Sequence, residues 1–170
     1  FTGAVLALKN AESDQAWVWL NQFNLLNKGL PVYYGFYLVG EICLQRTEYD
    51  KAIEAYQYFL KHYSGVNYVK DAHFKTGLCY LLNGDTSQAR AAFAQARHAG
   101  KEFTEADKNA ARSLATETLP NIKLTQARFY TDGGYYAAAQ KKLQTITPDD
   151  LPTRHDQVEY QYRKARVEHK

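Results

Sequence analysis

The chain has 170 residues, which suits one domain, and its 21 basic and 18 acidic residues leave a net charge of +3. That charge is too small to indicate a nucleic-acid-binding surface by itself, and no apolar run approaches the ~20 residues that a membrane-spanning helix needs. Because β-branched residues are sparse while Ala, Leu, Gln and Lys are common, the composition predicts an all-α fold.

Apolar residues recur at helical spacing along the whole chain, separated by short turn sequences. A first segment at 3–11 looks like the end of a helix, and Pro148 to Pro152 form a rigid loop before the last one. The predicted helices are, in chain order, 3–11, 13–26, 32–45, 47–62, 68–82, 86–98, 104–118, 121–131, 135–146 and 153–170.

Four positions carry the pattern of a helix N-cap. Thr47, Thr104 and Thr153 are each followed three residues later by an aspartate, the spacing of a capping box. Asp85 with Gln88 gives a fourth cap. We therefore expect a helix to begin directly after each of these residues.

A small residue, an alanine and an aromatic residue recur in the same order. Three positions match at a separation of 37 residues: Gly40 with Gly77, Ala52 with Ala89, and Tyr56 with Phe93. A fixed period in this range is typical of stacked helical hairpins. Small residues would let paired helices approach closely, and aromatic rings would fill the wider space between hairpins.

These residues resemble the tetratricopeptide repeat, a helix–turn–helix unit of 34 residues. The resemblance implies an all-α solenoid of antiparallel helical hairpins in a right-handed superhelix. Further residues fit the same pattern: Cys43, Tyr49, Tyr80, Gly84 and Ala96 in the clearest units, Ala127, Tyr130, Gly134, Tyr136, Ala139 and Leu143 in a later one, and Ala16, Leu20, Phe23 and Ala165 in partial ones.

The resemblance covers nearly the whole of 1–170, which we expect to be one domain and a piece of a longer array, since both ends fall inside helical patterns. Between Ala89 and Ala139 the spacing grows to 50 residues, so one extra helix should interrupt or bend the stack. The expected units are 1–31 (partial), 32–66, 67–100, an inserted helix at 101–119, 120–153 and 154–170 (partial).

The loop at 63–72 resembles those of bacterial cell-envelope tetratricopeptide proteins. That resemblance favours a periplasmic or outer-membrane-associated protein over a cytoplasmic one. Cys43 and Cys79 do not help to decide, because they lie in apolar stretches of helices expected ~8–10 Å apart, while a disulfide needs Cα atoms within ~7 Å. We predict two buried thiols.

No pattern for catalysis, a cofactor or a metal stands out. The five histidines are scattered, and none lies at metal-ligand spacing from another His, Cys or acid. Gly133 and Gly134 lack the neighbours of a phosphate-binding loop, and no serine lies in a nucleophile elbow. We therefore expect a protein that is not an enzyme and needs neither cofactor nor metal.

In the family, the first helix of each hairpin lines a concave groove where partners bind. Where members that hold a terminal carboxylate have Lys and Asn, this chain has Tyr37 and Glu41, so an aromatic and apolar groove is implied instead. The residues implied at this groove are Tyr34, Tyr37, Glu41, Leu44, Gln45, Asp71, Phe74, Leu78, Leu81, Leu124, Arg128, Asp132, Tyr162 and Arg166.

The function implied is a scaffold that binds a protein or peptide segment in the groove, with no nucleic acid involved. A competing interpretation is that the inserted helix or a neighbouring part of the chain covers these residues. The alternative function is a structural spacer or self-assembly segment of a larger regulator or envelope protein. The 14% of aromatic residues could suggest carbohydrate binding, but they fall at core helical positions.

Overall fold

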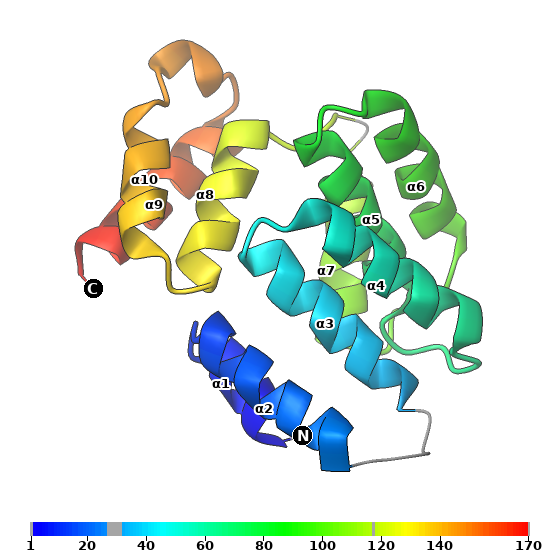
Figure 1. Ribbon diagram of the computed structural model, residues 1–170. Coiled ribbons are helices and arrows are strands. Elements are labelled where there is room, and N and C mark those ends of the chain that lie inside the picture. The colour runs from blue at the N-terminus through cyan, green and yellow to red at the C-terminus, as the bar shows by residue number, and fades with distance from the viewer. Residues whose placement is uncertain (1, 27–31, 117, 170) are drawn as a thin grey trace.

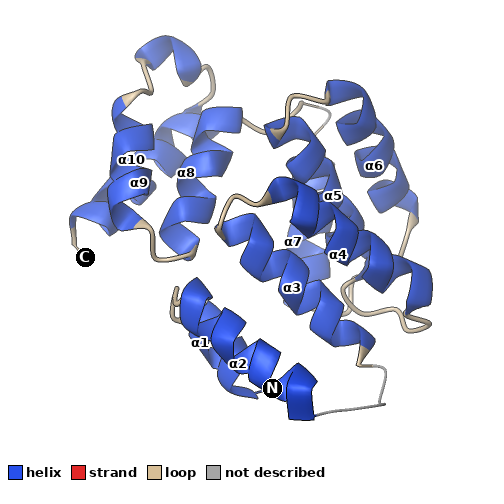
Figure 2. Cartoon of the chain, viewed as in Figure 1, coloured by secondary structure: helices blue, strands red, loops and turns tan. Residues whose placement is uncertain are grey.

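The computed structural model describes residues 2–26, 32–116 and 118–169, and every regular element in these ranges is helical (Figure 2). No helix there is long and apolar enough to cross a membrane. The helices are α1 (Thr2–Lys9), α2 (Ser13–Leu26), α3 (Tyr33–Gln45), α4 (Tyr49–His62), α5 (Val69–Leu82), α6 (Thr86–His98), α7 (Glu105–Leu114), α8 (Ile122–Asp132), α9 (Tyr136–Gln144), a 3₁₀ helix (Pro148–Asp150) and α10 (Arg154–Glu168).

Consecutive helices pack as hairpins: α1 with α2, α3 with α4, α5 with α6, and α8 with α9 (Figure 1). The first three hairpins form a stack, because α2 contacts α3 and α4 contacts α5. Helix α10 packs against both α8 and α9, and these three helices form the C-terminal unit. The predicted all-α solenoid of helical hairpins is confirmed.

A small residue and a large one 16 positions later meet where the two helices of a central hairpin cross. A Cβ atom added to Gly40 would lie 2.5 Å from the ring of Tyr56, and one added to Gly77 would lie 2.6 Å from the ring of Phe93. Each ring therefore occupies the space that a methyl group would need. Glycine is required at these two positions by packing, since neither has a positive φ.

The two outer hairpins keep the same spacing with different residues. Alanine replaces glycine and leucine replaces the ring, and all four side chains are buried: Ala4 with Leu20, and Ala127 with Leu143. An alanine 12 positions after each small residue is fully buried in all four hairpins: Ala16, Ala52, Ala89 and Ala139. The short segment before Ser13 thus supplies the first helix of a complete hairpin, with Ala4 at its small-residue position.

The inserted helix changes the path of the chain. Helix α7 packs mainly against α5, whereas α3 and α5 each pack on the second helix of the hairpin before them. The chain then runs to α8, which contacts α3 and α5. The expected extra helix is present. It ends at Leu114, four residues before the end of the predicted range 104–118.

The turn of the α8/α9 hairpin lies against the start of the chain. Tyr135 Oη donates a hydrogen bond of 2.9 Å to Asp14 Oδ1, across 121 residues of sequence. A Cβ atom added to Gly134, whose φ is +85°, would collide with the carbonyl oxygen of Ala11. This contact fixes the C-terminal unit beside the α1/α2 turn (Figure 1).

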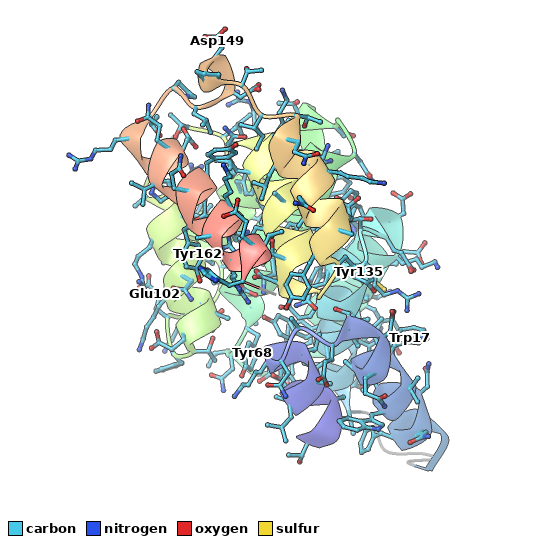
Figure 3. All side chains as sticks on the ribbon, turned by 90° about the vertical axis from the view of Figure 1, so that its left-hand side faces the viewer. Trp17, Tyr68, Glu102, Tyr135, Asp149 and Tyr162 are labelled. Atoms are coloured by element: carbon cyan, nitrogen blue, oxygen red, sulfur yellow. The ribbon has the colours of Figure 1, made fainter. Side chains whose placement is uncertain are left out.

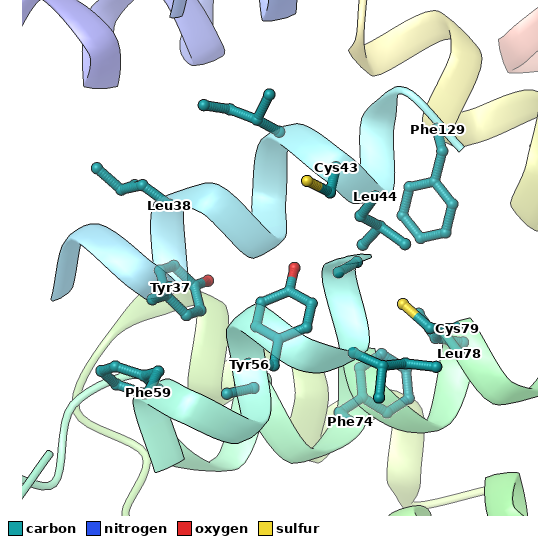
Figure 4. Packing of buried hydrophobic residues seen from close by; sticks show 14 of the residues in the cluster. Tyr37, Leu38, Cys43, Leu44, Tyr56, Phe59, Phe74, Leu78, Cys79 and Phe129 are labelled. Carbon is teal, nitrogen blue, oxygen red and sulfur yellow. The ribbon is translucent and has the colours of Figure 1, made fainter. Parts of the chain in front are cut away.

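Most of the core is one cluster that runs from α1 through α6 to α7 and α8. Phe129 enters it from α8 and lies beside Leu44 and near Cys79 (Figure 4). A second, smaller cluster holds α8, α9 and α10 together. Both cysteines are buried and unpaired, as predicted.

Three of the four predicted N-caps are confirmed. Asp85 accepts a hydrogen bond from the backbone N–H of the residue three positions on, and so do Thr104 and Thr153. The prediction for Thr47 is wrong. Thr47 has a φ of +60° and ends α3, because the N–H of Glu48 bonds back to the carbonyl oxygen of Cys43 at 2.8 Å.

Candidate functional site

Five polar side chains from α3, α4 and α5 form a cluster that we call the inner polar cluster: Tyr37, Glu41, Tyr56, Asp71 and Lys75. Lys75 Nζ lies 2.7 Å from both oxygens of Glu41 and 2.7 Å from Asp71 Oδ2. Tyr37 Oη donates to Asp71 Oδ2 at 2.6 Å, and Tyr56 Oη donates to Glu41 Oε1 at 2.5 Å. One ammonium group therefore ties the first helices of two hairpins together.

Burial and charge act in opposite directions on the pKa values of this cluster. Burial raises the pKa of Glu41, while the nearby Lys75 acts to lower it. Burial alone would lower the pKa of Lys75, but the carboxylates of Asp71 and Glu41 outweigh it and raise this pKa. Burial also raises the pKa of Tyr37, followed by the charge of Glu41. Lys75 thus stays protonated at neutral pH and partners both acids.

Many of the residues predicted at the groove are packed inside the protein. Helix α7 covers part of α5, and α8 covers parts of α3 and α5. Seven of the side chains are buried: Tyr37, Leu44, Asp71, Phe74, Leu78, Leu81 and Leu124. This portion of the inner face is filled by the chain's own helices.

The other seven predicted residues keep some exposure, including Gln45 and Asp132. The remaining five form what we call the inner strip: Tyr34, Glu41, Arg128, Tyr162 and Arg166. The ring centroids of Tyr34 and Tyr68 lie 4.8 Å apart. Burial raises the pKa of Tyr34, and Tyr68 and then the charge of Glu41 add to this rise. Figure 3 shows Tyr162 on α10 above Tyr68, on the side that carries Glu102. The strip takes its residues from α3 and α8, the first helices of two hairpins, and from α10.

The carboxylate of Asp132 organises the α10 end of the inner strip. Its Oδ1 atom accepts hydrogen bonds from Arg163 at 3.0 Å and Arg166 at 2.9 Å. Burial lowers the pKa of Arg128, and Asp132 is the strongest influence against that shift. Gln45, which was predicted at the groove, lies instead at the end of α3 and accepts a hydrogen bond of 2.6 Å from Ser13. Three guanidinium groups thus gather around one acid.

A cavity of about 390 Å³ opens where the inserted helix leaves the stack, between α5, α6, α7 and the chain that follows α7. We call it the break cavity. Phe74 is the predicted groove residue that lines it. The remaining described lining is Arg90, Phe93, Arg97, Ser113, Leu114, Thr116, Thr118, Leu119 and Pro120. The apolar members come from α5, α6, α7 and the chain after α7, and the arginines come from α6 alone.

A sequence model of the tetratricopeptide repeat family matches residues 71–99. The match spans α6 and most of α5, including the crossing of Gly77 with Phe93. Residues 71–99 are therefore similar to a tetratricopeptide repeat. Repeats of this kind generally mediate protein–protein interactions. No curated protein and no solved structure matches the chain significantly.

The sequence analysis did not identify Lys75 as an ion-pair partner of two groove residues, and it did not predict that Asp107 bonds to the start of α5. Besides accepting a hydrogen bond from the hydroxyl of Thr104, the buried Asp107 carboxylate accepts hydrogen bonds from the N–H groups of Tyr68 at 2.8 Å and Asp71 at 3.1 Å. No local motif could show that a carboxylate of α7 bonds to the start of α5. A signal existed for Lys75, which follows Glu41 by 34 residues, the length of one repeat.

Among residues 2–26, 32–116 and 118–169, no group of three His, Cys, Asp or Glu residues is placed to hold a metal ion. Burial raises the pKa of the Cys43 thiol to about 11, and Glu48 adds to this shift. Burial raises the pKa of Cys79 as well. Both thiols are therefore protonated at neutral pH, the form that is a poor nucleophile.

Proposed function

We propose that this chain is a non-enzymatic scaffold that binds a segment of a partner protein along the inner strip. The family match at 71–99 supports an interaction role. The observation that carries the proposal is the mixture of groups left accessible on the inner face. Tyr34 and Tyr162 contribute aromatic rings to the strip, and Glu41, Arg128 and Arg166 contribute charges of both signs.

Such a mixture suits recognition of a polypeptide. Tyr and Arg are the residues most enriched at the energetic centres of protein interfaces. Asp132 holds Arg166 in place before any partner arrives, so less side-chain entropy is lost on binding. Tyr162 is 53% exposed and can contact a partner without rearrangement of the core.

Photo-crosslinking from two positions tests this function. A photoreactive residue placed at Tyr162 should give discrete protein adducts in cells of the source organism, and Arg166→Glu should abolish them. The same residue at Tyr58, 43% exposed on α4, is the matched control. Equal adducts from both positions, or none from Tyr162, would contradict binding along the inner strip.

A structural spacer or self-assembly segment is the second candidate, favoured by the open face of α10. Ala165 occupies the small-residue position of this helix, yet it is exposed, whereas Gly40 and Gly77 are covered by a second helix. Val158 on α10 is 60% exposed. If copies associate through this face, light scattering should show a mass that rises with concentration and falls in Val158→Glu. A monomer at every concentration would rule out self-assembly.

We further propose a location in a bacterial cell envelope, supported by the resemblance of the loop at 63–72. Fractionation of the source cells should place the protein with periplasmic or outer-membrane markers. Recovery with a cytoplasmic marker would refute this location and leave the binding proposal intact.

A further inference from the structure

We propose that the break cavity is a second protein-binding site, which takes a large apolar side chain of a partner peptide flanked by carboxylates. The site goes beyond the inner strip, because it lies on α6, α7 and the chain after α7. Its existence follows from the path of the chain. Where a further hairpin would pack against α6, α7 instead turns onto α5 and leaves one side of α6 open.

The shape of the cavity fits an apolar anchor. Its volume of about 390 Å³ lies within the range of roughly 300–1,000 Å³ that is common for ligand pockets. Phe74, Phe93, Leu114 and Leu119 supply an apolar lining. Because aromatic side chains that fill well-packed pockets contribute much of the affinity of many interfaces, a Phe side chain is the expected occupant.

The positive charge of two arginines at the cavity favours a peptide in which acidic residues flank the apolar side chain. Arg90 and Arg97 lie seven residues apart on α6, which is two helical turns or roughly 10 Å along one face. No acid occurs in α6 or among the described lining residues. Among the described residues Arg90 forms no ion pair, and Arg97 Nε donates only a long hydrogen bond of 3.4 Å to the carbonyl oxygen of Leu114.

Two uncompensated guanidinium groups beside an apolar cavity are complementary to a pair of carboxylates, since Arg–carboxylate pairs are strong and directional. The hydroxyl groups of Ser113, Thr116 and Thr118 line the same cavity and can bond to a peptide backbone.

Three blocked synthetic peptides with a fluorescent label test the site: Asp-Glu-Phe-Leu-Glu-Asp, Lys-Lys-Phe-Leu-Lys-Lys and Asp-Glu-Ala-Ala-Glu-Asp. We expect the first to bind at least about tenfold more tightly than the other two. Arg90→Gln and Arg97→Gln should each weaken it about tenfold. Arg154→Gln, which changes an exposed arginine on α10, should leave its affinity unchanged, as should Tyr162→Ala on the inner strip.

Three outcomes would overturn the proposal. These are equal binding of the acidic and basic peptides, unchanged affinity in both α6 variants, and displacement of the peptide by a single-stranded DNA of equal charge. The last would show a general anion site. Circular dichroism of each variant checks that the helices are intact, and because Arg90 has no ion pair, its replacement should not disturb them.

Discussion

The two central hairpins and the C-terminal unit share one spacing but fill it differently. In α3/α4 and α5/α6 a glycine faces a ring, whereas in α8/α9 the same positions hold Ala127 and Leu143. The comparison teaches that a close crossing depends on the combined volume of two side chains, and glycine is one of two solutions. An aromatic ring at the crossing requires glycine opposite it, whereas the smaller leucine leaves room for alanine.

The same two regions differ in how their first helices are joined. Lys75 joins α3 to α5 inside the protein, with 17% of its side chain exposed. In the C-terminal unit Asp132 joins α8 to α10 through Arg163 and Arg166, with a third of its own side chain exposed. Ion pairs in the first setting are poorly screened by water, so their loss should cost more.

The largest effect is expected for Lys75→Met. This change removes the shared cation of Asp71, which is buried, and of Glu41, whose side chain is 18% exposed. Such a loss typically costs about 3–5 kcal/mol. Urea unfolding at neutral pH measures the difference in the free energy of unfolding. Adding Glu41→Gln should restore part of the loss, because one buried charge is removed. A cost below about 1 kcal/mol for the single change would show that the buried cluster is no stronger than a surface pair.

A smaller effect is expected for Asp132→Ala in the C-terminal unit. Asp132 and Arg166 are each about a third exposed, and the buried Arg163 keeps Glu159 as a partner at 2.7 Å. The expected cost is roughly 1 kcal/mol, falling further in high salt because exposed charges are screened. If this cost equals that of Lys75→Met, the contrast between the two regions is wrong.

The smallest effect concerns acid conditions and Asp150, at the edge of the C-terminal unit. Its hydrogen bond from Lys123, followed by that from the Thr147 N–H, lowers its pKa from 3.8 to about 2. A lowered carboxyl pKa adds stability that is present above about pH 4 and is lost as pH falls through about 2. Asp150→Asn should flatten the pH dependence of stability in this window, and an unchanged slope would contradict it.

Much of the fold could be predicted from local sequence patterns. The recurrence of Gly40, Ala52 and Tyr56 at Gly77, Ala89 and Phe93 specifies which faces of two helices meet, because crossing residues keep their order within a repeat. The Thr-x-x-Asp pattern predicted two N-caps and failed at Thr47. There the residue takes the left-handed conformation that ends α3, a position where glycine is common.

The candidate site was less predictable, because it depends on contacts between distant segments. The 50-residue spacing from Ala89 to Ala139 indicates an extra helix but gives no direction for it. Only the docking of α8 on α3 and α5 buries Phe129 beside Leu44 and closes that part of the inner face. The break cavity arises from the same long-range choice, so no local motif could predict it.

The most direct test of the crossing is a double-mutant cycle between Gly77 and Phe93, measured by urea unfolding. Gly77→Ala and Phe93→Leu should each destabilise the protein, and together they should cost less than their sum by about 1 kcal/mol, because they recreate the alanine–leucine crossing of α8/α9. Gly35→Ala, where nothing lies within 4 Å of the added Cβ, is the control and should stabilise the helix. Strict additivity of the Gly77 and Phe93 changes would contradict the account.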